Sequence, residues 1–177
     1  MHVAVAYILS AVLMLITVVT LSERMMASFA DVTTSWDALQ QRADGRADTR
    51  IGGPVGLSVS ATSTVEITLV NEGDAALGLF ADWDVIFEVQ QSPGLAIAYL
   101  TYTTSTSPST NQWAVKGIYL NAASSTPETV DPGVFNPGEE MVVVANPSPS
   151  VQSGTHDRAS FVTSNGSTAK VIFKVVE

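Results

Sequence analysis

The chain of 177 residues contains no cysteine, which excludes disulfide bonds, zinc–thiolate sites and thiol catalysis. Histidine is almost absent as well, because His2 and His156 are the only two in the sequence. Their wide separation offers no specific Ser-His-Asp arrangement, and no P-loop, G-x-G-x-x-G or G-x-S-x-G motif is present. We therefore expect no enzymatic activity and no cofactor.

Positive charge is scarce in the larger part of the chain. Residues 51–177 carry four basic and twelve acidic side chains, a net charge of −8. Nucleic acids are recognised by clustered Lys and Arg side chains, and no such cluster exists here. An acidic surface also resists non-specific association. We therefore expect a solvated outer surface and no nucleic-acid partner.

The carboxylates lack the spacing of a metal-binding loop. Asp82 and Asp84 flank Trp83, and Glu139 and Glu140 follow a Pro-Gly turn. No D-x-[DN]-x-[DN]-G run is present, although calcium needs several oxygen ligands at defined positions. We expect these carboxylates to lie on the surface, with loop-bound calcium as the alternative, and we assign no metal site.

The N-terminal run of residues 1–21 is apolar and has no charged side chain. About 20 apolar residues at 1.5 Å rise each match the roughly 30 Å hydrocarbon core of a bilayer. The run lacks the basic n-region and cleavage site of a signal peptide, and the Lys/Arg cluster that orients a simple anchor. Two interpretations remain, an uncleaved membrane helix or a mature chain already trimmed of a basic leader. The missing positive charge favours the second.

Helical periodicity continues beyond this run with a narrower apolar stripe. The spacing alternates between four and three residues, which is typical of a helix that packs on other helices. The stripe consists of Met25, Phe29, Val32, Trp36, Leu39 and Ala43. The pattern predicts one helix over residues 2–43, about 60 Å long, that is apolar all round in its first half. Packing of the stripe against the rest of the chain is the alternative.

The periodicity changes to two beyond Gly45 and the Gly52-Gly53-Pro54 run, which we expect to end the helix. Short alternating or apolar segments separated by turn residues predict seven or eight strands. They lie near residues 55–60, 65–69, 85–90, 95–103, 113–119, 141–145, 160–163 and 170–175. In the fifth of these segments we expect Trp113, Val115 and Tyr119 to share one face. The pattern predicts an α+β chain with a long N-terminal helix and an antiparallel Ig-like β-sandwich.

The domain organisation follows from these boundaries. We expect a helix over residues 1–44, a linker over 45–54 and a β head over 55–177. Residues 101–111 are rich in hydroxyl groups and predict an exposed loop suited to O-glycosylation. Residues 146–158 form a second predicted loop, in which His156 is expected to be solvated. Asn165 belongs to the one N-x-[ST] sequon without proline, so it is a candidate glycosylation site.

A helix that is apolar on every side must be buried on every side, by lipid or by other copies of itself. The stripe outside the expected membrane segment favours other copies. Transfer from a bilayer into a helical bundle exchanges one apolar environment for another, as in pilin-like filaments. The predicted assembly core is Val5, Ile8, Val12, Leu15, Val18, Met25, Phe29, Val32, Trp36 and Leu39.

The chain resembles the archaellin and archaellum-associated family of type IV pilin-like filament proteins. The resemblance rests on the apolar helix followed by a β-patterned head and on three segments. These are 69–77 (LVNEGDAAL), 79–88 (LFADWDVIFE) and 112–145, which holds Gln112-Trp113, Gly117-Ile118-Tyr119 and the Asn136-Pro137-Gly138-Glu139 turn. Val5 and Ser22 stand where classical bacterial pilins have glutamate and often proline, which favours the archaellin side.

The resemblance implies a structural subunit of an extracellular motility filament. Such a subunit is inserted in the membrane before assembly, polymerises with copies of itself through the N-terminal helix, and is handled and rotated by motor proteins of the membrane. Two alternatives follow from the same resemblance and scaffold. One is an adhesive type IV pilus-like subunit, and the other is a membrane-anchored stator protein that binds the cell envelope.

Overall fold

The computed structural model describes residues 2–59, 64–152 and 154–174, with the backbone alone described for 2–6 and 54–59. Residues 60 and 175, at the ends of two expected strands, lie outside the described residues. The chain divides into two compact units, Met1–Asp44 and Gly45–Glu177, which are treated separately below.

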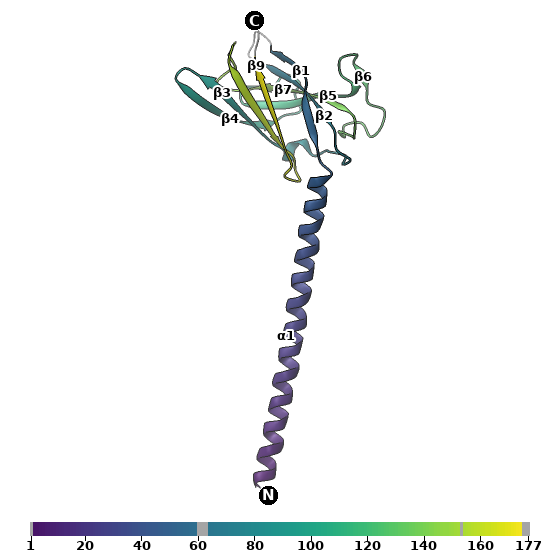
Figure 1. Ribbon diagram of the computed structural model, residues 1–177, viewed down its shortest axis with the longest axis vertical. Coiled ribbons are helices and arrows are strands. Elements are labelled where there is room, and N and C mark those ends of the chain that lie inside the picture. Colours follow the sequence, from purple (N-terminus) through teal and green to yellow (C-terminus); the bar gives the residue numbers. More distant parts are fainter. Residues whose placement is uncertain (1, 60–63, 153, 175–177) are drawn as a thin grey trace. The chain divides into compact units, whose positions relative to one another are not determined.

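The first element is one long helix, as predicted. Helix α1 runs without interruption from His2 to Ala47 (Figure 1). The expectation that Gly45 ends it is wrong, because one glycine costs only about 1 kcal/mol relative to alanine in a helix. Thr49 ends it instead, since its N–H bonds the Arg46 carbonyl at 3.2 Å and its Oγ1 bonds the Gly45 carbonyl at 2.8 Å. Arg46 in the last turn complements the helix dipole.

Residues 45–177 form the β head, in which the expected strands are present. The strands are β1 (Ile51–Val59), β2 (Val65–Asn71), β3 (Asp84–Gln91), β4 (Gly94–Tyr102), β5 (Gln112–Asn121), β6 (Thr126–Pro127), β7 (Glu140–Asn146), β8 (His156–Val162) and β9 (Thr168–Lys174). A 3-10 turn, η1 (Phe80–Asp82), precedes β3. The two-residue β6 was not predicted, because such a short strand leaves no periodic signal. Helix α1 and strand β1 both extend into the linker that was predicted over residues 45–54, so only residues 48–50 lie between the two elements.

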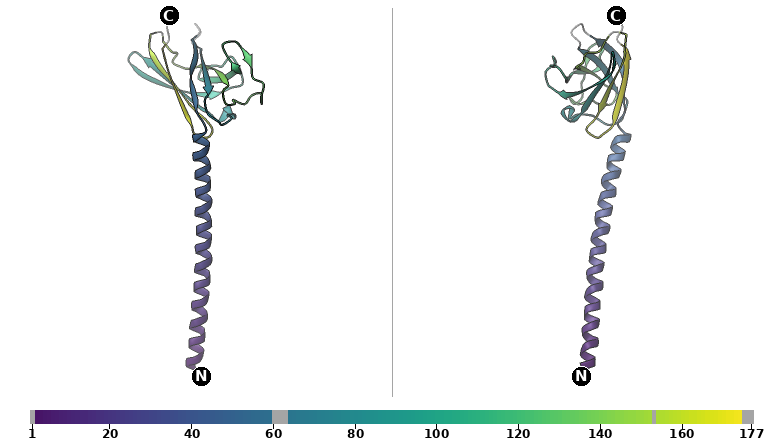
Figure 2. Two further views of the ribbon diagram at one scale, coloured as in Figure 1. Left: turned by 45° about the vertical axis from the view of Figure 1, so that its right-hand side comes forward. Right: turned by 90° about the vertical axis from the view of Figure 1, so that its left-hand side faces the viewer.

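Two sheets pack face to face in the head (Figure 2). One contains β1-β2-β7-β5 in that order with β6 added to β5, and the other contains β4-β3-β8-β9. Among the described strands every pairing is antiparallel except one. That exception joins the two sheets, since Thr101 and Tyr102 of β4 lie parallel to Gln112 and Trp113 of β5. The predicted antiparallel sandwich is therefore confirmed. The parallel pairing between β4 and β5 could not be predicted from the periodicity of the sequence.

The core lies between the two sheets. Alternate residues of β2 are buried, as the period of two predicts, and β9 shows the same alternation. Trp113, Phe87 and Phe161 are fully buried. The Trp113 and Tyr102 rings meet edge to face at 5.0 Å, and the Phe87 and Phe173 rings do so at 6.1 Å. Such pairs add to the stabilisation from buried apolar area.

A bulge in β5 overturns the expected position of Tyr119. Val115 pairs with Val143 of β7, but the next pair is Gly117 with Val142, so Lys116 is an extra residue. One extra residue reverses which face the following side chains occupy. Ile118 therefore lies beside Met141 in the core, and Tyr119 lies on the other face beside Glu140.

Two carboxylates of the head are buried, and one of them, Glu139, was expected on the surface. Glu139 accepts a bond from the Asn136 N–H at 2.8 Å, which closes the turn before β7. Asp157 lies in β8 rather than in a loop, and its Oδ1 accepts the Gln90 N–H at 2.8 Å. Both carboxylates satisfy backbone donors that would otherwise be left without a partner. His156 is exposed, as expected, but it begins β8.

Candidate assembly surfaces

The apolar side chains of α1 are exposed. The predicted core residues from Ile8 to Leu39 have exposed fractions between 49% and 68%. The side chain of Val5 lies outside the described set. Full burial of one such side chain contributes about 1.5–3 kcal/mol. The helix therefore carries a large apolar surface whose burial would strongly favour association.

The threonine hydroxyl groups in the apolar half of α1 are bonded within the helix. Thr17 donates its hydroxyl to the Leu13 carbonyl at 2.8 Å, and Thr20 donates to the Ile16 carbonyl at 2.9 Å. Unbonded hydroxyl groups are costly in apolar surroundings, so this bonding suits transfer into lipid or a dry bundle. A window of 18 residues near the N-terminal end has mean hydropathy 1.7, which is apolar enough for a membrane span.

The second half of α1 combines the apolar stripe with charged side chains. Met25, Phe29 and Trp36 of the stripe are exposed. Among the described residues of α1, no ion pair joins two of its own side chains. Arg24 and Asp37 therefore have charges available for neighbouring helices. The arrangement fits a bundle in which apolar stripes face inward and charges meet at their margins.

The segments that carry the family resemblance meet inside the head. The buried Asn71 amide donates to the Ala75 carbonyl at 2.9 Å and to the Phe135 carbonyl at 2.8 Å. Its Oδ1 accepts the Gly73 N–H at 3.1 Å. The backbone N–H of Asn71 bonds the Glu139 carbonyl at 3.0 Å. These residues hold two turns together. The segments that resemble the family therefore stabilise the fold of the head and do not form a binding site.

The candidate glycosylation residue is engaged in hydrogen bonds. Asn165 lies in the turn between β8 and β9, and its Nδ2 donates to the Gly45 carbonyl at 3.0 Å and to Thr49 Oγ1 at 2.7 Å. Its Oδ1 accepts the Ser167 N–H at 3.1 Å. The Asn-Gly pair, with Gly166 at φ 82°, is a hairpin-turn signal that could have predicted this structural role. Glycosylation of Asn165 stays a prediction.

The head also exposes apolar side chains that are not part of the predicted assembly core. Leu95, Ile97 and Tyr99 of β4 point outward and are 53%, 54% and 70% exposed. Ile172 of β9 is exposed on the same face. The signal was present in the sequence, because Leu95, Ile97 and Tyr99 alternate with the small residues Ala96 and Ala98 and so make both faces of the strand apolar.

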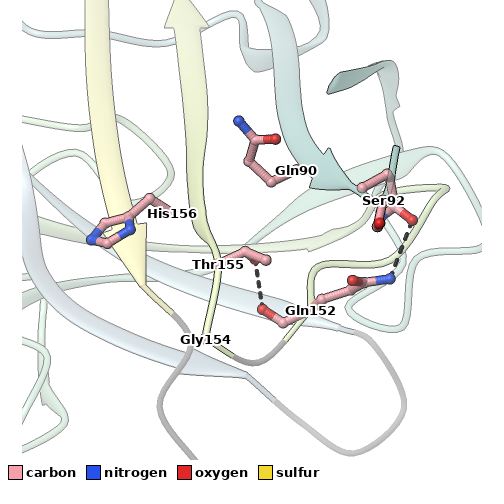
Figure 3. Close-up of a pocket in the computed structure, with 7 residues that line it drawn as sticks. Gln90, Ser92, Gln152, Gly154, Thr155 and His156 are labelled. Carbon is pink, nitrogen blue, oxygen red and sulfur yellow. Dashed lines mark hydrogen bonds between the residues drawn. The ribbon is translucent and has the colours of Figure 1, made fainter. Parts of the chain in front are cut away.

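A shallow polar hollow lies between the β3–β4 turn and the loop before β8 (Figure 3). Its volume is about 360 Å³. Within it the Gln152 amide donates to Gln91 at 3.2 Å, and the Thr155 hydroxyl donates to the Gln152 carbonyl at 2.7 Å. The lining is Gln90, Gln91, Ser92, Gln152, Gly154, Thr155 and His156. Across the described part of the chain, no group of three His, Asp or Glu side chains is placed to hold a metal ion.

Comparison with known proteins identifies the fold. The sequence matches no protein-family model and no curated protein. A chain of the archaeal flagellum of Methanospirillum hungatei strain JF1 superposes with a TM-score of 0.57 at 15% identity, over 95% of this chain and 93% of that one. The chain has an archaellin-like fold. The archaellin-like resemblance predicted from the sequence is thus confirmed at the level of the fold.

Two further matches come from Sulfolobus acidocaldarius. The archaellum periplasmic stator protein FlaG is 18% identical with a TM-score of 0.50, and the match covers 71% of this archaellin-like chain and 99% of FlaG. A chain from the stator complex of FlaF and FlaG is 18% identical with a TM-score of 0.48, over 67% of this chain and 84% of that one.

Proposed function

We propose that this chain is the main structural subunit of an archaellum-type motility filament. Copies of α1 pack together as the filament core, and the β heads form the outer sheath. A membrane motor rotates the filament, and assembly proteins of the membrane are its transient partners. The observation that carries the proposal is the exposed apolar surface of α1, whose threonine hydroxyl groups are bonded within the helix.

The energetics of α1 support a polymer core. At roughly 25 cal/mol per Å², burial of an all-apolar helix among its copies would give a large association free energy relative to water. Before assembly, lipid would cover the apolar surface of α1, since the helix is long and apolar enough to cross a bilayer. Extraction into the filament then costs little, since one apolar environment replaces another.

The likeness to the Methanospirillum flagellum chain supports the filament over an isolated anchor. That likeness extends over 95% of this chain, so it includes helix and head together. A simple anchor needs only enough helix to span the membrane, whereas α1 continues to Ala47 with an exposed apolar stripe. A stripe beyond the membrane needs partner helices.

A membrane-anchored stator is the second candidate. The fold match to the periplasmic stator protein FlaG supports it. In that role α1 would stay in the membrane and the head would bind a layer of the cell envelope. An adhesive pilus-like subunit is a third candidate, and the polar hollow beside His156 is the feature that such a function would use.

Filaments sheared from the cell surface test the proposal directly. We expect this chain to be the main protein of those filaments and its deletion to abolish swimming. Recovery of the chain only from membranes, at low copy number, would instead support the stator. Filaments made of this chain in cells that swim normally after its deletion would support adhesion.

A further inference from the structure

Strand β4 has an unprotected edge. Residues 94–100 pair with β3 on one side, and β4 meets β5 only at Thr101 and Tyr102. On the side away from β3, the backbone groups of residues 94–100 therefore have no partner strand within the described part of the head. The register with β3 is regular, and the nine residues of β4 include no charge and no proline. Such an edge is a template for contact with another chain.

The outward side chains of this edge continue across one sheet face. Ile97 lies beside Glu88, Glu88 beside Arg158, and Arg158 beside Ile172. Tyr99 begins the next row, which ends at Lys170 of β9. We call this surface of β4-β3-β8-β9 the sheet face. It is apolar along β4 and basic along β9, since Lys170 and Lys174 are exposed there.

Half of the basic side chains of the head lie on this face. Residues 45–177 contain six, and Arg158, Lys170 and Lys174 are three of them. Arg158 is neutralised by an ion pair with Glu88. Among the described residues, Lys170 and Lys174 have no ion-pair partner within the head. With Asp84 and Glu88 of β3 on the same face, the sheet face has a net charge of +1, and its free positive charges along β9 mark where an acidic neighbour would be attracted.

An arm of opposite character projects from the other side of the head (Figures 1 and 2). We define the arm as residues 120–134, which include β6. It joins β5 at Tyr119 and Asn121, whereas β4 joins β5 at Gln112 and Trp113, about 20 Å away along the strand. Its Leu120 and Val130 are 47% and 59% exposed, and its charged residues, Glu128 and Asp131, are both acidic.

We propose that the sheet face of one head docks the arm of a neighbouring copy of this chain. Leu95, Ile97 and Tyr99 then cover Leu120 and Val130, and Lys170 and Lys174 face Asp131. Charge selects this head-to-tail contact, because two arms or two sheet faces would bring like charges together. A contact between two different patches is heterologous, and it extends an open polymer when its rotation does not close a ring, as in a helical filament. The inference rests on the proposed filament as the setting in which heads are neighbours.

The absence of cysteine makes the test direct. Full-length chains with Ile97→Cys and with Val130→Cys are co-expressed, and sheared filaments are oxidised or treated with a short bismaleimide. We expect a cross-linked dimer in the mixture and none in filaments of either variant alone. The matched control pairs Val130→Cys with Ser164→Cys, an exposed position in the β8–β9 turn, and should give no dimer.

A charge exchange gives an independent readout. Lys170→Glu combined with Lys174→Glu should reduce the filament yield about three- to fivefold, and Asp131→Lys should restore it. Failure of Asp131→Lys to restore the yield would count against the arm as the partner.

Other outcomes of the cross-linking separate this inference from the proposed function. A dimer with Ile97→Cys alone would show a two-fold contact between β4 edges and overturn the arm as the partner. Absence of the mixed dimer overturns the contact, whether or not filaments form. A mixed dimer on membranes that lack filaments would keep the contact and remove the filament function.

Discussion

At the scale of single residues, buried amide groups determine how the head closes. Asn71 bonds two carbonyl groups and one N–H in a site that is almost fully buried. It lies where segments 69–77 and 135–139 meet, far apart in sequence. No local pattern marks such a residue, because its partners come from elsewhere in the chain.

Asn71→Ala is expected to destabilise the head by about 2–3 kcal/mol, because the Ala75 carbonyl loses its donor, the Gly73 N–H loses its acceptor and the Phe135 carbonyl keeps only the Leu77 N–H. Denaturant unfolding followed by circular dichroism measures the change. Asn121→Ala removes an exposed amide and should cost less than about 1 kcal/mol. Equal effects of the two substitutions would contradict the role assigned to Asn71.

Asn165 combines a hydrogen-bonding role with a candidate modification. Both hydrogens of its Nδ2 are donated, so a glycan there would remove one bond and lower stability by about 0.5–1.5 kcal/mol. If Asn165 is modified, the intact mass should exceed that of the chain and fall to it in Ser167→Ala, which destroys the sequon. An intact mass of 18.6 kDa for the native protein would remove the glycosylation prediction.

At the scale of elements, the β5 bulge decides which side chains enter the core. Lys116 has no partner residue in β7, and the pairs on both sides of it are otherwise continuous. Sequence alternation alone placed Tyr119 on the wrong face for this reason. Its ring instead lies over Gly117, where a Cβ would come within 2.5 Å of the Tyr119 hydroxyl.

Deletion of Lys116 should be tolerated, because every β5–β7 pair survives and only an exposed ion pair with Glu66 is lost. We expect an unchanged circular dichroism spectrum and a folded head. Deletion of Ala114 is the matched control, since loss of the bulge then puts Val115 in the fully buried place of Ala114 and Lys116 opposite Val143, and it should lower the stability of the head. A destructive effect of the Lys116 deletion would contradict the bulge.

For helix α1, the prediction concerns its apolar surface. Leu13→Asp or Val18→Asp should abolish filament assembly and leave the head folded, because a charge in a dry helical core is costly. Leu13→Met keeps size and hydrophobicity and should assemble. Electron microscopy of sheared filaments gives the result, and normal filaments from either aspartate variant would refute the helix core.

At the scale of the whole molecule, the two units have different tasks. The head buries its own apolar side chains, whereas α1 leaves its apolar side chains exposed. A protein of residues 45–177 should therefore be folded and soluble, and without α1 the contact between sheet face and arm should be too weak to polymerise it. Circular dichroism measures folding, and analytical ultracentrifugation measures the size of the particles. Stable polymers formed by the head alone would contradict the assignment of assembly to α1.

Local patterns in the sequence specify the elements. Continuous apolar composition and 3.6-residue periodicity predicted α1, while period-two alternation and short apolar runs predicted the strands longer than two residues, because these signals come from residues close together in the chain. The apolar surface of α1 was predictable for the same reason, since a helix without a polar face needs burial from outside.

The pairings between residues far apart in the chain follow from the packing of the head. The parallel β4–β5 junction, the bulge at Lys116 and the bond from Asn71 to Phe135 join residues at least 11 positions apart, and such contacts leave no periodic pattern in the sequence. The same holds for the sheet face, where strands distant in sequence bring Ile97 and Lys170 onto one surface. Local patterns record which face a strand buries, whereas the neighbours of that strand are selected by packing of the whole head.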